Sequence, residues 1–517
     1  MWVTCLEGEN PSIWTDFTVN YFTVNLNTIK KNCKNYIPFI SRLSSFFSLE
    51  RNLQSNPSIF VARENGRFSF SNRISLINVA STQRRKYSIK VINSCNKTEN
   101  DLSEFYAWFV GFSDGESNFQ IGVRYSDITK TKVTGFSFEF RIGLHVDDLA
   151  VLQFIKDKLG IGNITIKSTG DICTFSVSNE EGIYALISIF DKYNLNTTKY
   201  LDYLDFRKAF ILYKERDKNL YKLDKLKIID QIMELKNRMN RQRTCLNNNI
   251  FSLHTNKTGI NKNWLLGFIE AEGSFFVSRT DIEPSFSIEL SSAQLFILES
   301  IKDFFINNLG FDKYSIYILK SSAFNIFSIN QQKTKPSALL IVKNIRVLHN
   351  FFIPYFNAMK FNSKKGQDFL DWKLICEAVY KGSHKVEEIR ALILRLSYTM
   401  NSYRLSSNLN KESMEPLTQE ERNIIREALP TIVHLKDGRL LEAKSGKVSI
   451  NRSLSVYEVI TPQGEVLILD SFKDILNILG VGFRTLKRHI NDDNTSGDTN
   501  EYKGYKIKRV PVFLNNK

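Results

Sequence analysis

The chain contains two copies of one pattern, and this internal repeat limits its architecture more than any other feature of its 517 residues. Each copy opens with a similar apolar segment, at 105–123 and at 263–279. The same landmarks then follow in the same order, which predicts two copies of one folded unit. They are a strand (136–142 and 286–292), a helix ending in Leu-Gly (151–160 and 297–310), a second strand (174–179 and 326–330), a helix beginning near lysine (196–206 and 362–372) and a closing tail of similar sequence (235–243 and 396–404).

This order of elements predicts an α+β fold built from two pseudo-symmetric αββαββα units. A chain of 517 residues is longer than one hydrophobic core usually serves, so further parts are expected outside the repeat. We predict an N-terminal extension at 1–103, a first unit at 104–244, a linker at 245–261, a second unit at 262–404, a linker at 405–454 and a small module at 455–510.

The opening segment of each copy is predicted to be a helix that packs closely against its counterpart. Apolar residues at 105–112 recur with the spacing of one helical face. Gly111 and Gly115 also share a face, and the second copy has Gly267 and Ala271 at the matching positions. Glycine inside a helix costs about 1 kcal/mol relative to alanine. A close contact between the two helix backbones is a physical reason to accept that cost.

Both opening helices end in an acid-x-acid pattern, Asp114 with Glu116 and Glu270 with Glu272. A carboxylate at a helix C-terminus faces the negative end of the helix dipole. Two carboxylates side by side would also repel each other, and a divalent cation relieves both problems. This pattern therefore favours a metal-assisted site for attack on phosphodiesters at the seam between the two units.

The residues at the helix ends resemble a known family motif. FVGFSDGES at 109–117 and LLGFIEAEG at 265–273 resemble the LAGLIDADG motif of homing endonucleases and maturases, and the resemblance covers roughly 104–404. Its catalytic acid falls on Glu116 and Glu272, whereas Ser117 replaces the usual final glycine. The resemblance implies that the two units form a saddle on double-stranded DNA, that Glu116 and Glu272 bind Mg²⁺ or Mn²⁺, and that the protein is a monomer.

The same resemblance implies further site residues. A catalytic lysine after the second half of each unit matches Lys199 and Lys364, although the neighbouring Lys365 competes with Lys364. The strands of such proteins lie in the DNA major groove, where basic and amide side chains contact base edges or phosphates. The matching candidates are Gln120, Arg124, Lys130, Lys132, Arg141, Arg279, Lys333 and Lys335.

The C-terminal module has the pattern of a small DNA-binding domain. Residues 455–472 predict two strands, and 471–491 predict two short helices separated at Gly480. This arrangement resembles the nuclease-associated modular DNA-binding domains of homing endonucleases, with a helix-turn-helix whose basic residues are Arg484, Lys487 and Arg488. An αα-hairpin without a DNA-binding role is the alternative.

The net charge of +16 and a pI near 9.3 favour a polyanionic partner. No stretch of about 18 apolar residues occurs, so we expect no membrane span. The family resemblance implies a site-specific, intron-encoded DNA endonuclease, and the composition suggests AT-rich organellar coding, so we predict a mitochondrial location. The basic, serine-rich segment 63–90 resembles a mitochondrial presequence near Arg85, but it lies far inside the chain, which favours a basic linker. An intron maturase that binds its host intron RNA, a protein with both functions, and a catalytically silent DNA-binding regulator are the alternatives.

Overall fold

The computed structural model describes residues 60–64, 67–71, 97–126, 128–130, 132–216, 222–239, 260–316, 323–329, 336–406, 415–435, 439–450, 455–469, 471–487 and 499–512. The chain divides into two compact units, residues 1–89 and residues 90–517. In the first unit, β1 (Phe60–Glu64) pairs antiparallel with β2 (Arg67–Ser71). None of the described helices combines the length and the hydropathy needed to cross a membrane. The predicted DNA-binding residues Lys333, Lys335 and Arg488 lie outside the described residues.

The first copy of the repeat folds around a four-stranded antiparallel sheet with the strand order β3-β4-β6-β5. A 3-10 turn, η2 (Val146–Asp148), follows the second strand. The elements in chain order are α3 (Lys97–Glu116), β3 (Ser117–Tyr125), β4 (Val133–His145), α4 (Leu149–Leu159), β5 (Asn163–Ile166), β6 (Ile172–Val177), α5 (Glu180–Lys192), α6 (Lys199–Glu215) and α7 (Lys222–Arg238).

The second copy repeats this topology, with the strand order β7-β8-β10-β9. Its elements are α9 (Lys262–Glu272), β7 (Gly273–Ser278), β8 (Glu283–Ser291), η3 (Ser292–Gln294), α10 (Leu295–Asn308), β9 (Asn325–Ile329), β10 (Ser337–Val342), a continuous helical stretch of α12 (Ile345–Val347), η4 (Leu348–Phe352) and α13 (Ile353–Asn357), then α14 (Lys365–Lys381), η5 (Ser383–Lys385), α15 (Glu387–Ser397) and η6 (Asn401–Arg404). The predicted fold class, two αββαββα units in an α+β fold, is confirmed.

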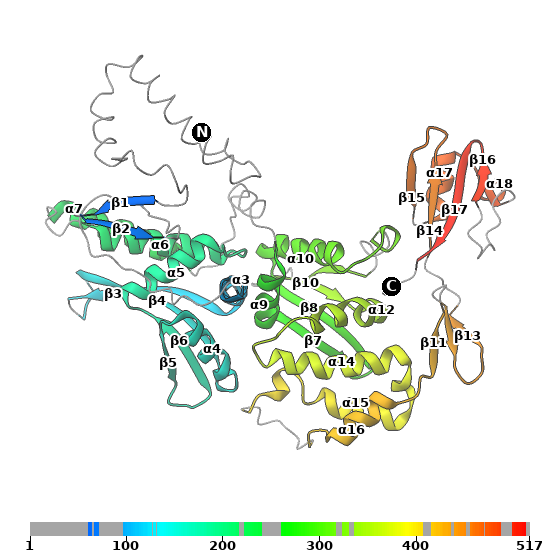
Figure 1. The fold of residues 1–517 in the computed structure, drawn as a ribbon, viewed down its shortest axis with the longest axis horizontal. Helices are drawn as coiled ribbons and strands as arrows, with labels where there is room; N and C mark the ends of the chain where they lie inside the picture. Colours follow the sequence, from blue (N-terminus) through cyan, green and yellow to red (C-terminus); the bar gives the residue numbers. More distant parts are fainter. Residues whose placement is uncertain are drawn as a thin grey trace, which may run out of the picture. The chain divides into compact units, whose positions relative to one another are not determined.

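One face of each sheet is buried against helices, because the strands alternate apolar and polar residues. In β6 every second side chain is buried, and β4 shows the same alternation over most of its length. Aromatic side chains fill both cores: Phe119 contacts Phe140, Phe190 and Phe206 in the first, and Phe275 contacts Phe286, Phe356, Phe369 and Trp372 in the second. The helices α3 and α9 lie side by side between the two sheets (Figure 1).

The segment after the repeat differs from the linker predicted at 405–454. It contains α16 (Gln419–Glu427) and a three-stranded sheet of β11 (Ile432–His434), β12 (Leu440–Glu442) and β13 (Val448–Ile450). A capping box starts the helix, since the Thr418 side chain accepts from the Glu421 N–H and the Glu421 side chain accepts from the Thr418 N–H. Buried Ile425 then fixes the apolar side of the helix.

The C-terminal module has the strands and helices that the sequence predicts. A four-stranded sheet with the order β15-β14-β17-β16 carries two short helices separated at Gly480, which has a positive φ of 61°. Glycine adopts this left-handed conformation without strain. The elements are β14 (Ser455–Ile460), β15 (Val466–Leu469), α17 (Phe472–Leu479), α18 (Phe483–Lys487), β16 (Thr499–Tyr502) and β17 (Tyr505–Pro511).

Candidate active site

The two opening helices meet through their backbones, as the small residues predict. A Cβ atom added at Gly111 would lie 2.0 Å from the Trp264 carbonyl oxygen, and one added at Gly267 would lie 2.0 Å from the Trp108 carbonyl oxygen. One turn further on, a Cβ at Gly115 would lie 2.3 Å from the Ala271 Cβ. Only glycine permits this approach, so the C-terminal ends of α3 and α9 are held close together.

The first acid of each motif ties the two helices to each other. Trp264 Nε1 on α9 donates to Asp114 on α3 at 2.8 Å, and Trp108 Nε1 on α3 donates to Glu270 on α9 at 2.8 Å. Both carboxylates are buried, and burial raises the pKa of each while the hydrogen bonds they accept lower it. A buried carboxylate is tolerated only when its oxygens are paired in this way.

The same two acids also hold the loop that precedes each lysine helix. Asp114 accepts from the Asn196 N–H at 2.8 Å, the Thr197 N–H at 3.1 Å and the Thr197 hydroxyl at 2.6 Å. Glu270 likewise accepts from the Asn362 N–H at 3.0 Å and the Ser363 N–H at 2.6 Å. The acids at these motif positions are therefore structural.

The second acids, Glu116 and Glu272, end α3 and α9 on the same side of the seam. Burial raises the pKa of Glu116 to about 7, and the charge of Glu272 is the next cause. Burial also raises the pKa of Glu272, while the nearby lysines 199 and 365 lower it. Two neighbouring carboxylates with raised pKa values, one of them raised further by the charge of the other, are typical of a functional site.

One lysine from each copy lies beside this carboxylate pair. Lys199 Nζ donates to the carbonyl oxygens of Ser113 at 2.9 Å and Gly115 at 2.8 Å, and burial lowers the pKa of its ammonium group. Lys365 Nζ donates to the Gly273 carbonyl at 2.7 Å, next to the second glutamate. The positive charges of both lysines lower the pKa of both Glu116 and Glu272.

The lysine predicted for the second copy, Lys364, lies away from the carboxylate pair. Lys364 lies at the N-cap of α14, and its Nζ pairs with Asp147 of the first copy at 3.0 Å instead of approaching the glutamates. Adjacent residues at a helix start point about 100° apart, so only one of the two lysines can occupy the site. The spacing to the following aspartate, three residues in both Lys199–Asp202 and Lys365–Asp368, is the sequence signal that matches Lys365 with Lys199.

The carboxylate pair fits a hard divalent cation such as Mg²⁺ or Mn²⁺ better than a soft metal ion. Among the described residues, no group of three or more His, Cys, Asp or Glu side chains could hold a metal ion by itself. Two carboxylates are a typical protein contribution for Mg²⁺, which keeps several waters and binds substrate phosphates. The repulsion between Glu116 and Glu272 gives a physical reason for a cation to bind here.

The predicted DNA-binding residues of the first sheet are accessible. Lys130 and Lys132 are exposed between β3 and β4, and Gln120 is partly exposed on β3. Arg141 is exposed on β4 and pairs with Glu139 at 2.7 Å. Arg124 is exposed as well, and its Nη2 donates to the Phe136 carbonyl at 3.1 Å.

Arg279 has a different environment from the one predicted. Its guanidinium lies between the rings of Tyr398 and Tyr403, 4.0 and 4.5 Å from their centroids, and donates to the hydroxyl and the carbonyl of Ser397. Through these contacts the Arg279 side chain packs the end of β7 against residues 397–403 of the same unit. Of the module residues, Arg484 and Lys487 are exposed on α18.

The outward faces of the two sheets differ chemically, which the sequence analysis missed. The strands β7 to β10 contain no Lys or Arg, whereas β3 and β4 contain Arg124 and Arg141. The second sheet instead carries serines and two exposed rings, with Phe276 48% and Phe327 53% exposed.

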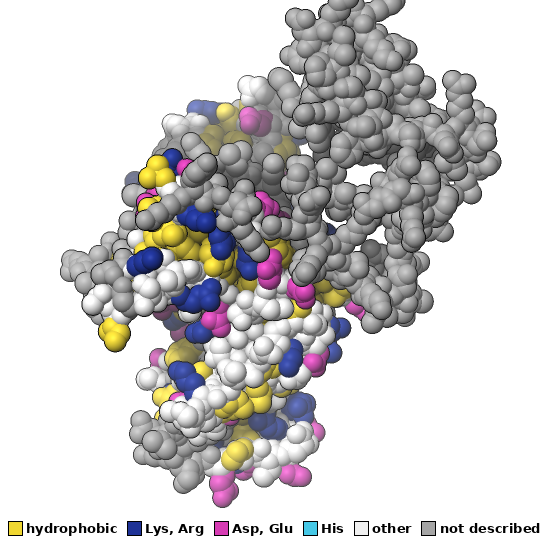
Figure 2. Space-filling model, turned by 90° about the vertical axis from the view of Figure 1, so that its left-hand side faces the viewer, with side chains coloured by type: hydrophobic (Ala, Val, Ile, Leu, Met, Phe, Trp, Pro, Cys, Tyr) yellow, Lys and Arg dark blue, Asp and Glu magenta, His cyan; other side chains and the backbone are white. Residues whose placement is uncertain are grey.

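On the described part of the face in Figure 2, Lys and Arg are interspersed with acidic and uncharged side chains and do not form one patch.

Comparison with known proteins finds the same family in both copies of the repeat. The model of the family described as LAGLIDADG endonuclease matches residues 109–210 and 265–376. Similar curated proteins are "Uncharacterized mitochondrial protein RF1" of Saccharomyces cerevisiae, 28% identical over 61% of this chain and 63% of that protein, and "Probable intron-encoded endonuclease Cox1-I1b" of Schizosaccharomyces pombe, 30% identical over 40% of this chain and 50% of that protein. The matches thus span less than two thirds of these relatives.

Solved structures with a similar fold are also found. A crystal structure of the LAGLIDADG homing endonuclease I-GzeII in complex with its DNA target is 24% identical with a TM-score of 0.46, over 58% of this chain and 99% of that chain. A structure of the I-LtrWI LAGLIDADG homing endonuclease bound to target DNA is 24% identical with a TM-score of 0.47, also over 58% of this chain and 99% of that chain.

Proposed function

Since the chain belongs to the LAGLIDADG endonuclease family through residues 109–210 and 265–376, we propose that it is a site-specific endonuclease that cuts double-stranded DNA. The observation that carries this proposal is the pair of Glu116 and Glu272 at the end of the α3–α9 seam, with Lys199 and Lys365 beside it. Acids are present in both copies, and a protein that only bound RNA or DNA would have no chemical use for them.

Each side chain of the site has a role that follows from its position. Glu116 and Glu272 concentrate negative charge where a cation and the scissile phosphates meet. Lys199 and Lys365, held by carbonyl oxygens of the two motifs, supply positive charge to the phosphate oxygens during cleavage. Asp114 and Glu270 keep the helix ends and the lysine loops in register, so the reacting groups need little reorganisation.

Endonucleases of this family are metal-dependent. We propose that Mg²⁺ or Mn²⁺ is the ion and that Glu116 and Glu272 hold it, since carboxylate oxygens suit both cations. When bound, such an ion neutralises charge on the phosphate and lowers the pKa of an attacking water.

The two sheets supply the DNA contacts in this proposal, with Gln120, Arg124, Lys130, Lys132 and Arg141 in the first unit. The exposed Arg484 and Lys487 of the module add phosphate contacts. A single chain with both copies needs no partner subunit, so the protein acts as a monomer. The named relatives are fungal proteins described as mitochondrial or intron-encoded, which supports a mitochondrial, intron-encoded endonuclease here.

The proposal is tested with purified protein, Mg²⁺ and a duplex that spans the uninterrupted sequence of the gene in which the reading frame lies. We expect one double-strand break near the insertion point, no break in EDTA, and no break in a duplex of the same composition and shuffled sequence. Binding to this duplex without any cleavage would contradict the proposal, and binding to the intron RNA would then support a maturase.

A further inference from the structure

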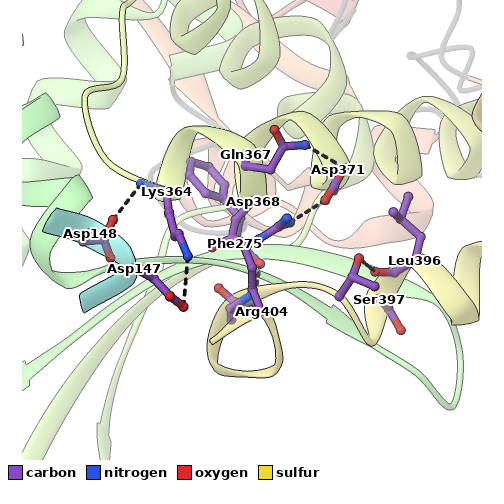
Figure 3. A network of polar contacts seen from close by, with 12 residues as sticks. Asp147, Asp148, Phe275, Lys364, Gln367, Asp368, Asp371, Leu396, Ser397 and Arg404 are labelled. Atoms are coloured by element: carbon purple, nitrogen blue, oxygen red, sulfur yellow. Dashed lines mark hydrogen bonds and ion pairs between the residues drawn. The ribbon is translucent and has the colours of Figure 1, made fainter. Parts of the chain in front are cut away.

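The loop before α14 is held by residues of the other copy of the repeat. Asp148 in η2 accepts a hydrogen bond from the Lys364 N–H at 3.0 Å, and Asp147 pairs with Lys364 Nζ at 3.0 Å. Figure 3 shows both aspartates pointing at Lys364 from the first unit. The Asp147 side chain is 15% exposed and the Lys364 side chain is 35% exposed, so this ion pair is partly shielded from solvent.

This loop also positions part of the proposed active site. Its residues Asn362 and Ser363 donate their N–H groups to the motif acid Glu270. The residue directly after Lys364 is Lys365, whose Nζ donates to the Gly273 carbonyl. Holding Lys364 therefore fixes the start of α14, and with it the position of Lys365 at the seam.

A second segment joins the same contact. Ser406 donates its N–H and its hydroxyl to Asp147, both at 2.8 Å. Just before it, Arg404 Nε donates to Asp368 on α14 at 2.8 Å (Figure 3), and the Asn401 N–H donates to the same carboxylate at 3.0 Å. Residues 401–406 thus connect α14 to Asp147, and the start of α14 is held from two sides.

The corresponding position on the other side of the seam lacks the charged partners. In η3 the residues that match Asp147 and Asp148 are Ala293 and Gln294, and the residue that matches Lys364 is Thr198. Neither alanine nor glutamine can form an ion pair. The buried Gln294 Oε1 has no hydrogen-bond partner among the described residues. The loop that carries Lys199 therefore has no ion pair with the other copy that corresponds to the one between Lys364 and Asp147.

We propose that the bridge formed by Asp147 and Asp148 with Lys364 is a positioning device that sets Lys365, so that cleavage of one DNA strand depends on it and cleavage of the other does not. This inference rests on the proposed endonuclease function. Asp147, Asp148 and Lys364 are positioning residues in this account, because they act through the loop and the helix start and not on the DNA. Small displacements of a catalytic group can cost up to about 100-fold in rate.

The test measures each strand separately, with the target duplex labelled on one strand at a time. In Asp147→Ala and Lys364→Met we expect one strand to be cut about 10-fold or more slowly, so that duplex nicked in the other strand accumulates. Lys364→Arg keeps a cation opposite Asp147 and should restore near-normal cutting. Lys214→Met is the matched control, since Lys214 forms a similar ion pair with Glu180 at 2.7 Å in the helical layer.

Equal slowing of both strands, or no change in either, would overturn the inference. If the wild-type chain cuts neither strand, the proposed function is contradicted. The bridge itself is then tested by amide hydrogen exchange of the two lysine loops. We expect Asp147→Ala to increase exchange at 362–365 while leaving 196–199 unchanged. Equal effects on both loops, or none, would refute the one-sided bridge.

Discussion

Replacing Glu116 by glutamine should make the metal-free protein more stable at alkaline pH. The side chain is partly buried at the seam, and this burial together with the charge of Glu272 raises its pKa from 4.5 to about 7. Because the folded state holds the proton more tightly, this carboxyl favours folding fully below pH 4.5 and loses that contribution as the pH rises through about 7. Glutamine has the same shape and no charge to lose.

The size of the effect follows from the pKa shift. At about 1.4 kcal/mol per pKa unit, the ionised glutamate costs about 3 kcal/mol of the free energy of unfolding at pH 8. The melting temperature in EDTA should then be roughly 6 °C higher for Glu116→Gln than for the wild type at pH 8. At pH 5 the two melting temperatures should differ little.

The assay is thermal unfolding followed by circular dichroism between pH 5 and pH 8, with and without Mg²⁺. Added Mg²⁺ should raise the melting temperature of the wild type at pH 8 and should change that of the variant little. A difference between the two proteins that does not depend on pH would refute the reasoning, because the carboxyl would then be ordinarily solvated.

Three further predictions follow from the same contacts. Lys365→Met should slow cleavage of the strand it serves by about 100-fold, as a strand-specific rate assay at saturating Mg²⁺ would show, and this loss should exceed that of Lys364→Met. Gly111→Ala should destabilise the chain by about 1–3 kcal/mol in chemical unfolding, although alanine favours a helix, because its Cβ would meet the Trp264 carbonyl; a stabilised variant would contradict the backbone contact. Arg279→Ala should lower the melting temperature without changing base preference in a binding-site selection, and an altered preference would show that the cation contacts DNA.

The fold was predictable because local patterns and the repeat agree with each other. The apolar face of α3, the glycines of the seam and the alternation of the strands each point to the same αββαββα unit. The capping box at Thr418 and Glu421 is a local signal of the same kind, and it would have identified α16 within the predicted linker.

The candidate site was only partly predictable, because several of its contacts join distant parts of the chain. Nothing near Asp147 in the sequence indicates its pairing with Lys364, more than 200 residues away. A solvent-exposed arginine and one packed between aromatic rings look alike in a sequence, so the sequence does not indicate that the Arg279 guanidinium lies between the rings of Tyr398 and Tyr403. The choice of Lys365 over Lys364 likewise depends on the register of α14.

The central claim is that Glu116 and Glu272 form one metal-dependent site for DNA cleavage. The most direct measurement compares wild type, Glu116→Gln and Glu272→Gln for cleavage and for binding of the same target duplex in Mg²⁺. We predict that each glutamine variant loses double-strand cleavage while its dissociation constant stays within a few-fold of the wild-type value. Normal cleavage by either variant would contradict the account.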